Sequence, residues 1–343
     1  MTAVSMRINT SKLYHPQDAV KLAYQAAFGA EHMLGDVKKA RAYFDEEYGK
    51  DPSSTPLLEE IAQDVVRVNL SAWKEAKLPA DWLFDLFVLS TGEKNENAQD
   101  LFCSFLDELA ELAKKSAFQF TNTEWVDYIS SNNMYDQPRP VRHSEDYRKK
   151  EKPAYRVVSG FFVRLIPILY KLKGRQEAVI GIDGRAASGK STMADGLAKI
   201  FKTVPISTDD FFLPGELRTD KRLDEPGGNV QYERFAKEVI PKLKGEQTLS
   251  YRRFNCKTMD FDEPKTIPIT RFMVIEGAYC HHPYFGEYLD VKVFSDVTHD
   301  AQMERITQRN GEQIAEIFRN KWIPMEEKYF NANKIKEKSS LVV

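Results

Sequence analysis

The sequence is poor in cysteine and balanced in charge. Its 343 residues include three cysteines, Cys103, Cys256 and Cys280, which are far apart and odd in number. This pattern excludes a disulfide framework or a paired CxxC metal site, and it favours a reducing cytosol. Lysine and arginine total 49 against 51 aspartate and glutamate residues, a formal net charge of −2. Such a balance gives no global sign of a nucleic-acid or anionic-membrane partner.

The sequence also lacks a segment that suits a membrane anchor or a secretory signal. The longest apolar stretch, residues 157–172, is interrupted by Ser159, Arg164 and Pro167 and is too short to cross a bilayer. The first fourteen residues are polar and have no apolar core of the kind found in signal peptides. We therefore expect a cytoplasmic protein without a membrane partner.

The N-terminal part of the chain has the periodicity of helices. Apolar residues recur at helical spacing over much of residues 16–115, and strand-like alternation is scarce there. One stripe predicts a helix over residues 57–70, after a loop at 51–56, and consists of Leu57, Ile61, Val65 and Val68. The sequence therefore predicts an all-α domain over residues 1–150, of unknown role. Segments 24–32 and 142–144 stand out by composition, and ordinary helix packing explains them as well.

The middle of the chain reads as a connection. Residues 130–152 are polar and contain two prolines and a charged run, which indicates a linker or a long functional loop. Residues 155–172 then predict a helix, kinked near Pro167. We assign residues 151–174 to a connecting helix between two domains.

After Gly174 strands and helices alternate. Short apolar runs predict strands at residues 177–183, 204–207, 272–275, 291–294 and 339–343. Helices are predicted between them, at residues 190–201 and 298–309 among others. This alternation is typical of a parallel sheet covered by helices. Residues 175–343 are therefore predicted to form an α/β domain.

The clearest motif is Gly184-Arg-Ala-Ala-Ser-Gly189-Lys190-Ser191, which fits the P-loop pattern G-x-x-x-x-G-K-[ST]. A strand is predicted before it and a helix after it, which argues against a chance match. Its glycines allow backbone N–H groups to face phosphate oxygens, and the following helix adds its positive end. We expect Lys190 to bridge the β- and γ-phosphates of ATP and Ser191 to hold Mg²⁺. The predicted ATP-binding residues are Gly184, Arg185, Ala186, Ala187, Ser188, Gly189, Lys190, Ser191 and Thr192.

Acidic residues follow two of the other predicted strands. Asp209 and Asp210 come directly after residues 204–207, where they can supply a base for a substrate hydroxyl and a contact to Mg²⁺. A solvated acidic turn or a helix cap would explain them equally. Glu276 ends the strand over residues 272–275, which suits a carboxylate near Mg²⁺, although some strands simply end in an acid.

Two arginines share one face of the predicted helix at residues 298–309. The i, i+4 spacing of Arg305 and Arg309 aligns them, and such cations neutralise charge on a transferred phosphoryl group. A solvated face with local pairing to Glu304 is the alternative.

In this order, the motifs resemble the uridine kinase and phosphoribulokinase-like superfamily, which includes nicotinamide riboside kinases and a type of bacterial pantothenate kinase. The resemblance covers about half the chain and rests on the P-loop, Ser-x-Asp-Asp-Phe-Phe, Ile-Glu-Gly and the arginine-bearing helix. It implies that Asp209 is the general base, that Glu276 acts near the metal, and that Arg305 and Arg309 belong to a lid. It also suggests Asp224 as a substrate contact.

The acceptor site departs from the uridine kinase pattern. Uridine kinases hold the base with aromatics and a histidine, whereas the counterpart here, Arg253-Phe-Asn-Cys-Lys-Thr258, lacks the second aromatic and the histidine. A pyrimidine nucleoside is therefore disfavoured. The cations of this segment suit an anionic substrate, and a solvated basic hairpin explains them equally. The candidate substrate-binding residues are Asp210, Phe212, Asp224, Arg253, Tyr279 and His281.

These features predict an ATP- and Mg²⁺-dependent kinase whose partner is a small molecule with an acceptor hydroxyl, which can be nucleoside-like, vitamin-like or sugar-like. The alternative is a nucleotide-sensing regulator whose helical half binds a partner according to ATP occupancy. A nucleic-acid 5′-hydroxyl kinase is disfavoured by the lack of a basic, aromatic-rich surface signal. The sequence leaves the oligomeric state open, a homodimer included.

Overall fold

The computed structural model describes residues 6–49 and 56–343. The chain divides into two compact units, an N-terminal unit (Met1–Ile166) and a C-terminal unit (Pro167–Val343). Five of the six residues of the loop predicted at 51–56 lie outside the described part. Within that part, no helix has the length and apolar character needed to cross a membrane.

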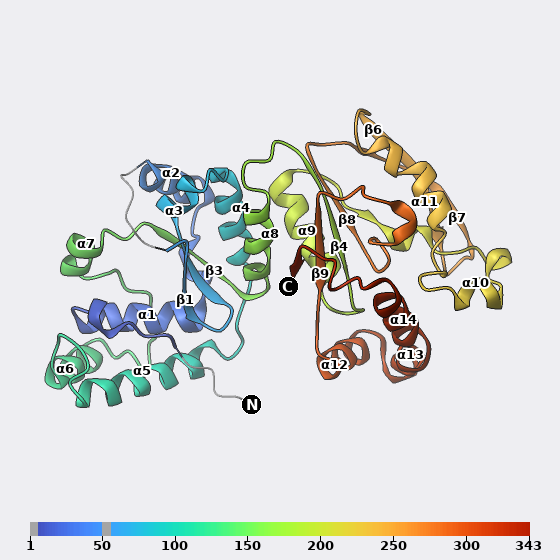
Figure 1. Cartoon of the computed structure of the whole chain (residues 1–343). Coiled ribbons are helices and arrows are strands. Elements are labelled where there is room, and N and C mark those ends of the chain that lie inside the picture. The colour runs from blue at the N-terminus through green and yellow to red at the C-terminus, as the bar shows by residue number, and fades with distance from the viewer. Residues whose placement is uncertain (1–5, 50–55) are drawn as a thin grey trace. The chain divides into compact units, whose positions relative to one another are not determined.

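The N-terminal unit combines helices with a small sheet (Figure 1). Its helices are α1 (Pro16–Phe28), α2 (Val37–Tyr48), α3 (Leu70–Glu75), α4 (Ala80–Ser90), α5 (Ala98–Lys114), α6 (Asn122–Ser131) and α7 (Glu145–Glu151). Helix α1 packs against α5 and α6, and α4 packs against the strand β3. The antiparallel sheet has the order β1 (Leu58–Ala62), β2 (Val65–Asn69), β3 (Tyr155–Ser159).

The prediction of an all-α domain is wrong because of this sheet. Residues 57–70, predicted as a helix, form the hairpin β1–β2, with Asp64 at the turn (φ 56°). The β-branched Val65, Val66 and Val68 favour an extended backbone. Strand β2 is the central one and pairs with β3, almost ninety residues later in the chain. That distant partner decides the structure and leaves no trace in the local pattern.

The single connecting helix predicted over residues 151–174 is also wrong. Its first part is the strand β3, which Gly160 (φ 64°) ends. A 3₁₀ helix at Gly160–Arg164 and the short helix α8 (Leu165–Lys171) follow. The boundary between the two units falls within α8.

The C-terminal unit is built on a five-stranded parallel sheet, as predicted. Its order is β10 (Leu341–Val342), β9 (Val291–Ser295), β4 (Ala178–Gly184), β8 (Phe272–Glu276), β5 (Ile206–Ser207). Its remaining helices are α9 (Lys190–Phe201), α10 (Asp220–Asp224), α11 (Tyr232–Glu238), α12 (His299–Asn310), α13 (Glu312–Ile317) and α14 (Ile323–Asn333). A π-helical segment, Phe318–Trp322, leads into α14. The antiparallel hairpin β6 (Thr248–Asn255) and β7 (Asp260–Pro268) stands apart from the main sheet.

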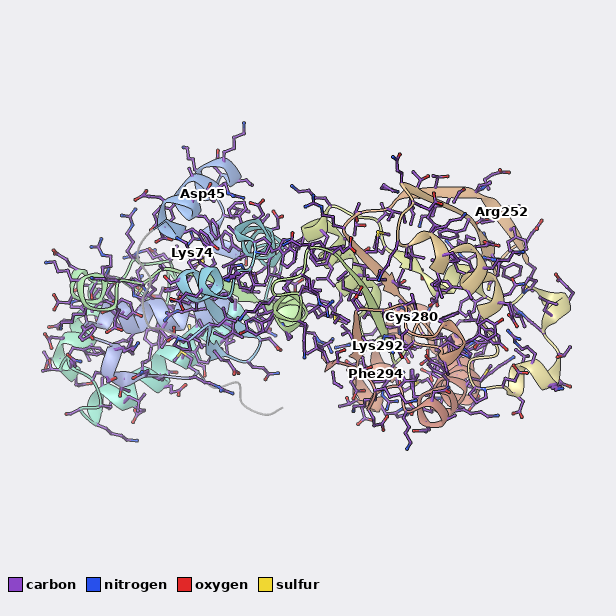
Figure 2. All side chains as sticks on the ribbon, turned by 45° about the horizontal axis from the view of Figure 1, so that its top comes forward. Asp45, Lys74, Arg252, Cys280, Lys292 and Phe294 are labelled. Carbon is purple, nitrogen blue, oxygen red and sulfur yellow. The ribbon has the colours of Figure 1, made fainter. Side chains whose placement is uncertain are left out.

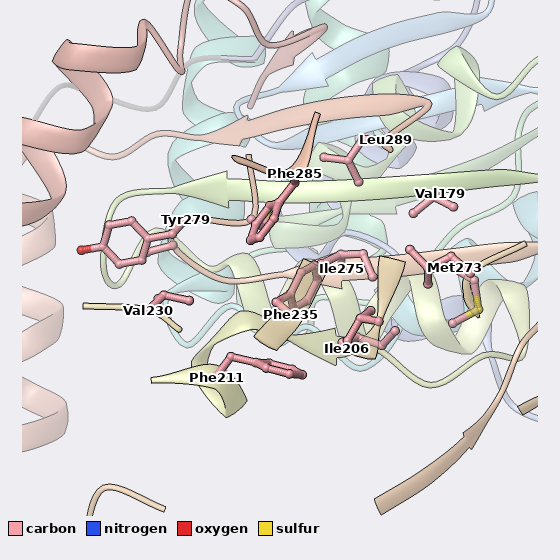
Figure 3. Packing of buried hydrophobic residues seen from close by; sticks show 14 of the residues in the cluster. Val179, Ile206, Phe211, Val230, Phe235, Met273, Ile275, Tyr279, Phe285 and Leu289 are labelled. Carbon is pink, nitrogen blue, oxygen red and sulfur yellow. The ribbon is translucent and has the colours of Figure 1, made fainter. Parts of the chain in front are cut away.

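Apolar side chains from β4, β5 and β8 build the core of this unit (Figure 3). Ile206, Phe211, Phe235 and Ile275 are fully buried in one cluster. Burial of a phenylalanine side chain contributes roughly 2 kcal/mol. Cys280 belongs to the same interior (Figure 2). The core thus packs against three adjacent strands, and the carboxyl ends of such strands are where parallel α/β sheets hold their ligands.

Candidate active site

The P-loop joins the central strand β4 to helix α9. Three of its residues have positive φ: Gly184 (138°), Ala187 (55°) and Gly189 (97°). A Cβ atom on Gly184 would lie 2.1 Å from the carbonyl oxygen of Ser295, so only glycine lets β9 approach this closely. The loop ends at the N-terminus of α9, whose free N–H groups and dipole attract anions.

Lys190, Ser191 and Glu276 meet at this loop. The Lys190 ammonium donates hydrogen bonds to the carbonyl oxygens of Gly184 (2.7 Å) and Arg185 (2.8 Å). The Ser191 hydroxyl donates to Glu276 Oε2 at 3.0 Å. Glu276 is buried at the end of β8, and its pairing with Ile182 of β4 brings it beside the P-loop. The sheet register and the start of α9 therefore bring Ser191 and Glu276, two of the three predicted magnesium contacts, side by side.

Asp209 lies on a 3₁₀ turn, Thr208–Phe211, that follows β5. The hydroxyl of Thr208 ties this turn to the end of β8 by donating to the carbonyl oxygens of Glu276 (3.2 Å) and Ala278 (2.9 Å). Gly277 (φ 117°) makes room for the turn, because a Cβ there would lie 2.3 Å from Thr208 Oγ1 and 3.3 Å from Asp209 Oδ1.

The environment of Asp209 disfavours its charge. Crowding by protein atoms and the nearby carboxylate of Glu276 raise the pKa of Asp209 to about 6, against the opposing effect of Lys190. Asp209 nevertheless keeps an exposed surface, which limits this desolvation and leaves the carboxylate open to an acceptor. A reachable carboxylate with a raised pKa beside a P-loop is suited to accept a proton at neutral pH.

Its neighbour Asp210 is held differently. The buried carboxylate of Asp210 accepts a hydrogen bond from the Tyr251 hydroxyl (2.8 Å) and lies 3.5 Å from Arg253 Nε. Arg253 keeps 59% of its side chain exposed, on the hairpin that also carries Arg252 (Figure 2). Phe212 packs against the core. Asp210 thus anchors β6 to the 3₁₀ turn Thr208–Phe211 and leaves Asp209 as the reachable acid.

The other predicted substrate contacts are more dispersed. Asp224, at the end of α10, is exposed and pairs with Lys328 of α14. Tyr279 is buried, and His281 places its Nε2 atom 3.1 Å from the carbonyl oxygen of Gly181 in β4. Burial lowers the pKa of His281. Both rings pack within the fold, and their contact with an acceptor stays a prediction.

The two arginines of α12 have separate contacts. Arg305 donates from Nη1 to the carbonyl oxygen of Ala187 at 3.1 Å, which places it on the P-loop. Arg309 donates from Nε to the side chain of Asn310 at 2.9 Å. The structure thus brings Arg305 to the P-loop and leaves Arg309 with a neighbour on its own helix.

Sequence reasoning missed Asp183, the residue before the P-loop. Its fully buried carboxylate accepts hydrogen bonds from the backbone N–H of Gly184 (2.7 Å), Tyr279 (3.2 Å) and His281 (3.0 Å), and from the Tyr329 hydroxyl (2.8 Å). Asp183 thereby fastens the P-loop to the segment after β8 and to α14. An aspartate inside an apolar strand was the available signal.

Sequence reasoning also missed Glu326 of α14. Glu326 Oε2 accepts the backbone N–H of Ala186, inside the P-loop, at 2.9 Å. Gln302 of α12 holds the same residue from the other side, donating to its carbonyl oxygen at 3.1 Å. Because Glu326 lies 140 positions from Ala186, no local pattern indicates this contact.

The residues present suit a nucleotide with Mg²⁺. In the described part of the chain, no group of three or more His, Cys, Asp or Glu residues could hold a metal ion alone. Mg²⁺ at phosphate-binding sites keeps several waters and phosphate oxygens and needs only one or two protein ligands. Ser191 with Glu276, and Asp209 through water, meet that requirement.

No family model matches the sequence, and no curated protein matches it. Solved structures do. A protein from Bacillus stearothermophilus described as a possible uridine kinase is 18% identical, with 52% of this chain and 95% of that chain covered and a TM-score of 0.41. A candidate fructose transport system kinase from Silicibacter sp. TM1040 is 20% identical, with 53% and 97% covered and a TM-score of 0.40.

Proposed function

We propose that the C-terminal unit is an ATP- and Mg²⁺-dependent phosphotransferase that phosphorylates a hydroxyl of a small metabolite. The observation that carries the proposal is the convergence of Lys190, Ser191, Glu276 and Asp209 on one P-loop. The Coulombic influence of both Lys190 and Glu276 on Asp209 supports this grouping. A phosphate-binding loop, a metal-ligand pair and a base are the parts that phosphoryl transfer requires.

The P-loop residues would bind the nucleotide. The N-terminus of α9 and the loop N–H groups would hold its phosphates, and Lys190 would leave the carbonyl oxygens of Gly184 and Arg185 to bridge the outer two. Ser191 and Glu276 would hold Mg²⁺, which when bound shields charge on the phosphate oxygens. Arg305, already on the loop at Ala187, would add positive charge near the transferred group.

Asp209 would act on the acceptor. Its carboxylate takes the proton of the acceptor hydroxyl while that oxygen bonds to the γ-phosphorus and the bond to the bridging oxygen breaks, which leaves ADP. The raised pKa of Asp209 makes it a stronger base than an ordinary aspartate, yet it stays largely ionised at pH 7. The exposed Arg253, paired with Asp210 next to this base, supports an acceptor that carries negative charge.

The test is ADP release by purified protein with Mg²⁺ and ATP, across nucleosides, vitamins, sugars and sugar phosphates. We expect release that depends on one acceptor class and that falls at least 100-fold in Asp209→Asn, with ATP affinity nearly unchanged. Asp195→Asn, an exposed acid on α9, is the matched control and should keep the activity. Undiminished turnover in Asp209→Asn would contradict the assigned base.

A further inference from the structure

Four consecutive side chains of helix α14 contact the P-loop and the residues around it. The contacts join Glu326 to Ala186 N–H, Glu327 to Arg185, Lys328 to Asp224 and Tyr329 to Asp183. Two of these partners belong to the P-loop itself, and Asp183 directly precedes it. The proposed function uses none of these four residues of α14.

Glu326 holds a position that suits a phosphate oxygen. It is 8% exposed, and its Oε2 atom lies 2.9 Å from the backbone nitrogen of Ala186. Backbone N–H groups of a P-loop are the donors that cradle phosphate, so a side-chain carboxylate occupies one of them here. Both a carboxylate and a phosphate are acceptors only, and they repel each other when placed together.

The charges around Glu326 favour its neutral form. Burial and the carboxylates of Asp183 and Asp209 raise the pKa of Glu326 to about 7, although Lys190 and the N–H of Ala186 oppose the shift. Arg185 faces α14 too, and pairs with Glu327 and Asp296. The buried phenol of Tyr279 also lies close enough to Glu326 for the two groups to interact. A nucleotide phosphate placed nearby would add negative charge and raise the pKa of Glu326 further.

Helix α14 is too firmly packed for undocking to be the easier response. Ile323, Tyr329 and Phe330 are buried, and Tyr329 and Phe330 belong to the main core cluster. Undocking would return these three large side chains to water, which the hydrophobic effect opposes. Taking up one proton near pH 7 costs far less.

We propose that Glu326 is a proton-coupled nucleotide contact, which takes up a proton from solvent when nucleotide binds and donates its O–H to a phosphate oxygen. Its other oxygen keeps the N–H of Ala186, because a neutral carboxyl group both donates and accepts. The inference rests on the nucleotide binding proposed above and adds to it one further residue, Glu326, that contacts the phosphate. It predicts that nucleotide affinity rises as pH falls through 7.

Isothermal titration calorimetry of the full-length protein with ADP in excess Mg²⁺ tests this inference. Titrations in buffers of different ionisation enthalpy give the number of protons taken up on binding. The proteins compared are the wild type, Glu326→Gln, Glu326→Ala and the neighbouring control Glu327→Gln. At pH 7.5 we expect the wild type and Glu327→Gln to take up roughly 0.7 proton more than either Glu326 variant. Between pH 6 and pH 8 the wild-type affinity should weaken roughly tenfold more than that of Glu326→Gln.

The outcomes separate this inference from the function on which it rests. Subtracting the proton number of the Glu326 variants from that of the wild type removes the protons that ADP itself binds or releases. The variant Glu326→Gln keeps a carbonyl oxygen that can accept the N–H of Ala186. Equal proton uptake in all four proteins would overturn the role of Glu326 while leaving nucleotide binding intact. Smaller uptake by the wild type than by the Glu326 variants would mean that α14 undocks, which overturns it too. Absence of ADP binding in all four proteins would contradict the nucleotide site itself.

Discussion

Asp209 and Asp210 are adjacent acids with different surroundings. Asp210 is fixed by Tyr251 and Arg253. Asp209 is surrounded by protein atoms and lies near the carboxylate of Glu276, and both raise its pKa. The sequence predicted that this pair matters, because motif order alone links it to the P-loop. The different roles depend on contacts from β6 and β8, which no local pattern contains.

The raised pKa of Asp209 predicts an acidic limb in the rate. Only the ionised carboxylate accepts a proton, so kcat should fall as pH drops below about 6, approaching a tenfold loss per pH unit. The measurement is kcat at saturating ATP and acceptor from pH 5 to pH 8. A rate that stays level down to pH 5 would show that Asp209 does not titrate as the base.

His143 predicts a pH dependence of stability in the N-terminal unit. Burial, with help from Arg67 and Lys21, lowers the pKa of His143 to about 4 despite the opposing effect of Asp18. The unfolded chain protonates this imidazole near pH 6.5, so between pH 6.5 and 4 the unfolded state binds more protons. Stability should therefore fall by about 3 kcal/mol as pH drops across that window.

Urea unfolding followed by tryptophan fluorescence measures this loss. In a Trp322→Phe background the remaining tryptophans are Trp73, Trp82 and Trp125, all in the N-terminal unit. In that background, His143→Phe keeps an aromatic ring that can stack on Tyr147. The ring centroids of His143 and Tyr147 are 3.8 Å apart in the wild type. His143→Phe should be less stable at pH 7 and lose less stability between pH 6.5 and 4. An identical slope with and without His143 would refute the assignment.

At the scale of elements, Gly277 lets the end of β8 and the 3₁₀ turn that carries Asp209 lie close together. Gly277→Ala would strain a φ of 117° and push Cβ into Thr208, whose hydroxyl ties the turn to β8. We expect a loss of about 2 kcal/mol in unfolding free energy and a fall in kcat larger than the change in ATP affinity, because Asp209 moves.

Gly215→Ala is the control for that substitution. Its φ lies outside the positive range, and a Cβ there meets only the flexible end of Met259 at 3.4 Å. Thermal unfolding and steady-state kinetics of both variants measure the two effects. If Gly277→Ala matched the control in stability and kcat, the close approach at Thr208 would be of no consequence.

The five strands of the parallel sheet and the helices α9 and α12 could be predicted because each one has a local signal. Strands β4 and β8 are continuous apolar runs, and α9 and α12 have the periodicity of helices. The hairpin β1–β2 has an ambiguous signal, since its β-branched valines favour a strand while the spacing of Ile61, Val65 and Val68 suits a helix. Its strand character depends on pairing with β3, a contact between distant segments.

At the scale of the whole molecule, all the proposed catalytic residues lie in the C-terminal unit, while the N-terminal unit has its own core. The presence of two units was predicted from the sequence, because helical periodicity gives way to alternating strands and helices near Gly174. The boundary, however, falls between Ile166 and Pro167, where a short helix leaves no break in the sequence pattern. The role of the N-terminal unit therefore has to be sought through its response to nucleotide.

Hydrogen exchange with mass spectrometry measures that response in both units at once. ADP with Mg²⁺ at 100 times its dissociation constant stabilises the state that binds it by about 2.7 kcal/mol, which slows exchange through global opening roughly 100-fold. We expect this slowing in peptides from β4 and β8 and none in peptides from β2 and α5. Lys190→Met should abolish the effect. Equal slowing in β2 and α5 would mean that nucleotide occupancy reaches the N-terminal unit, and it would favour a nucleotide-sensing regulator over a kinase whose two units act separately.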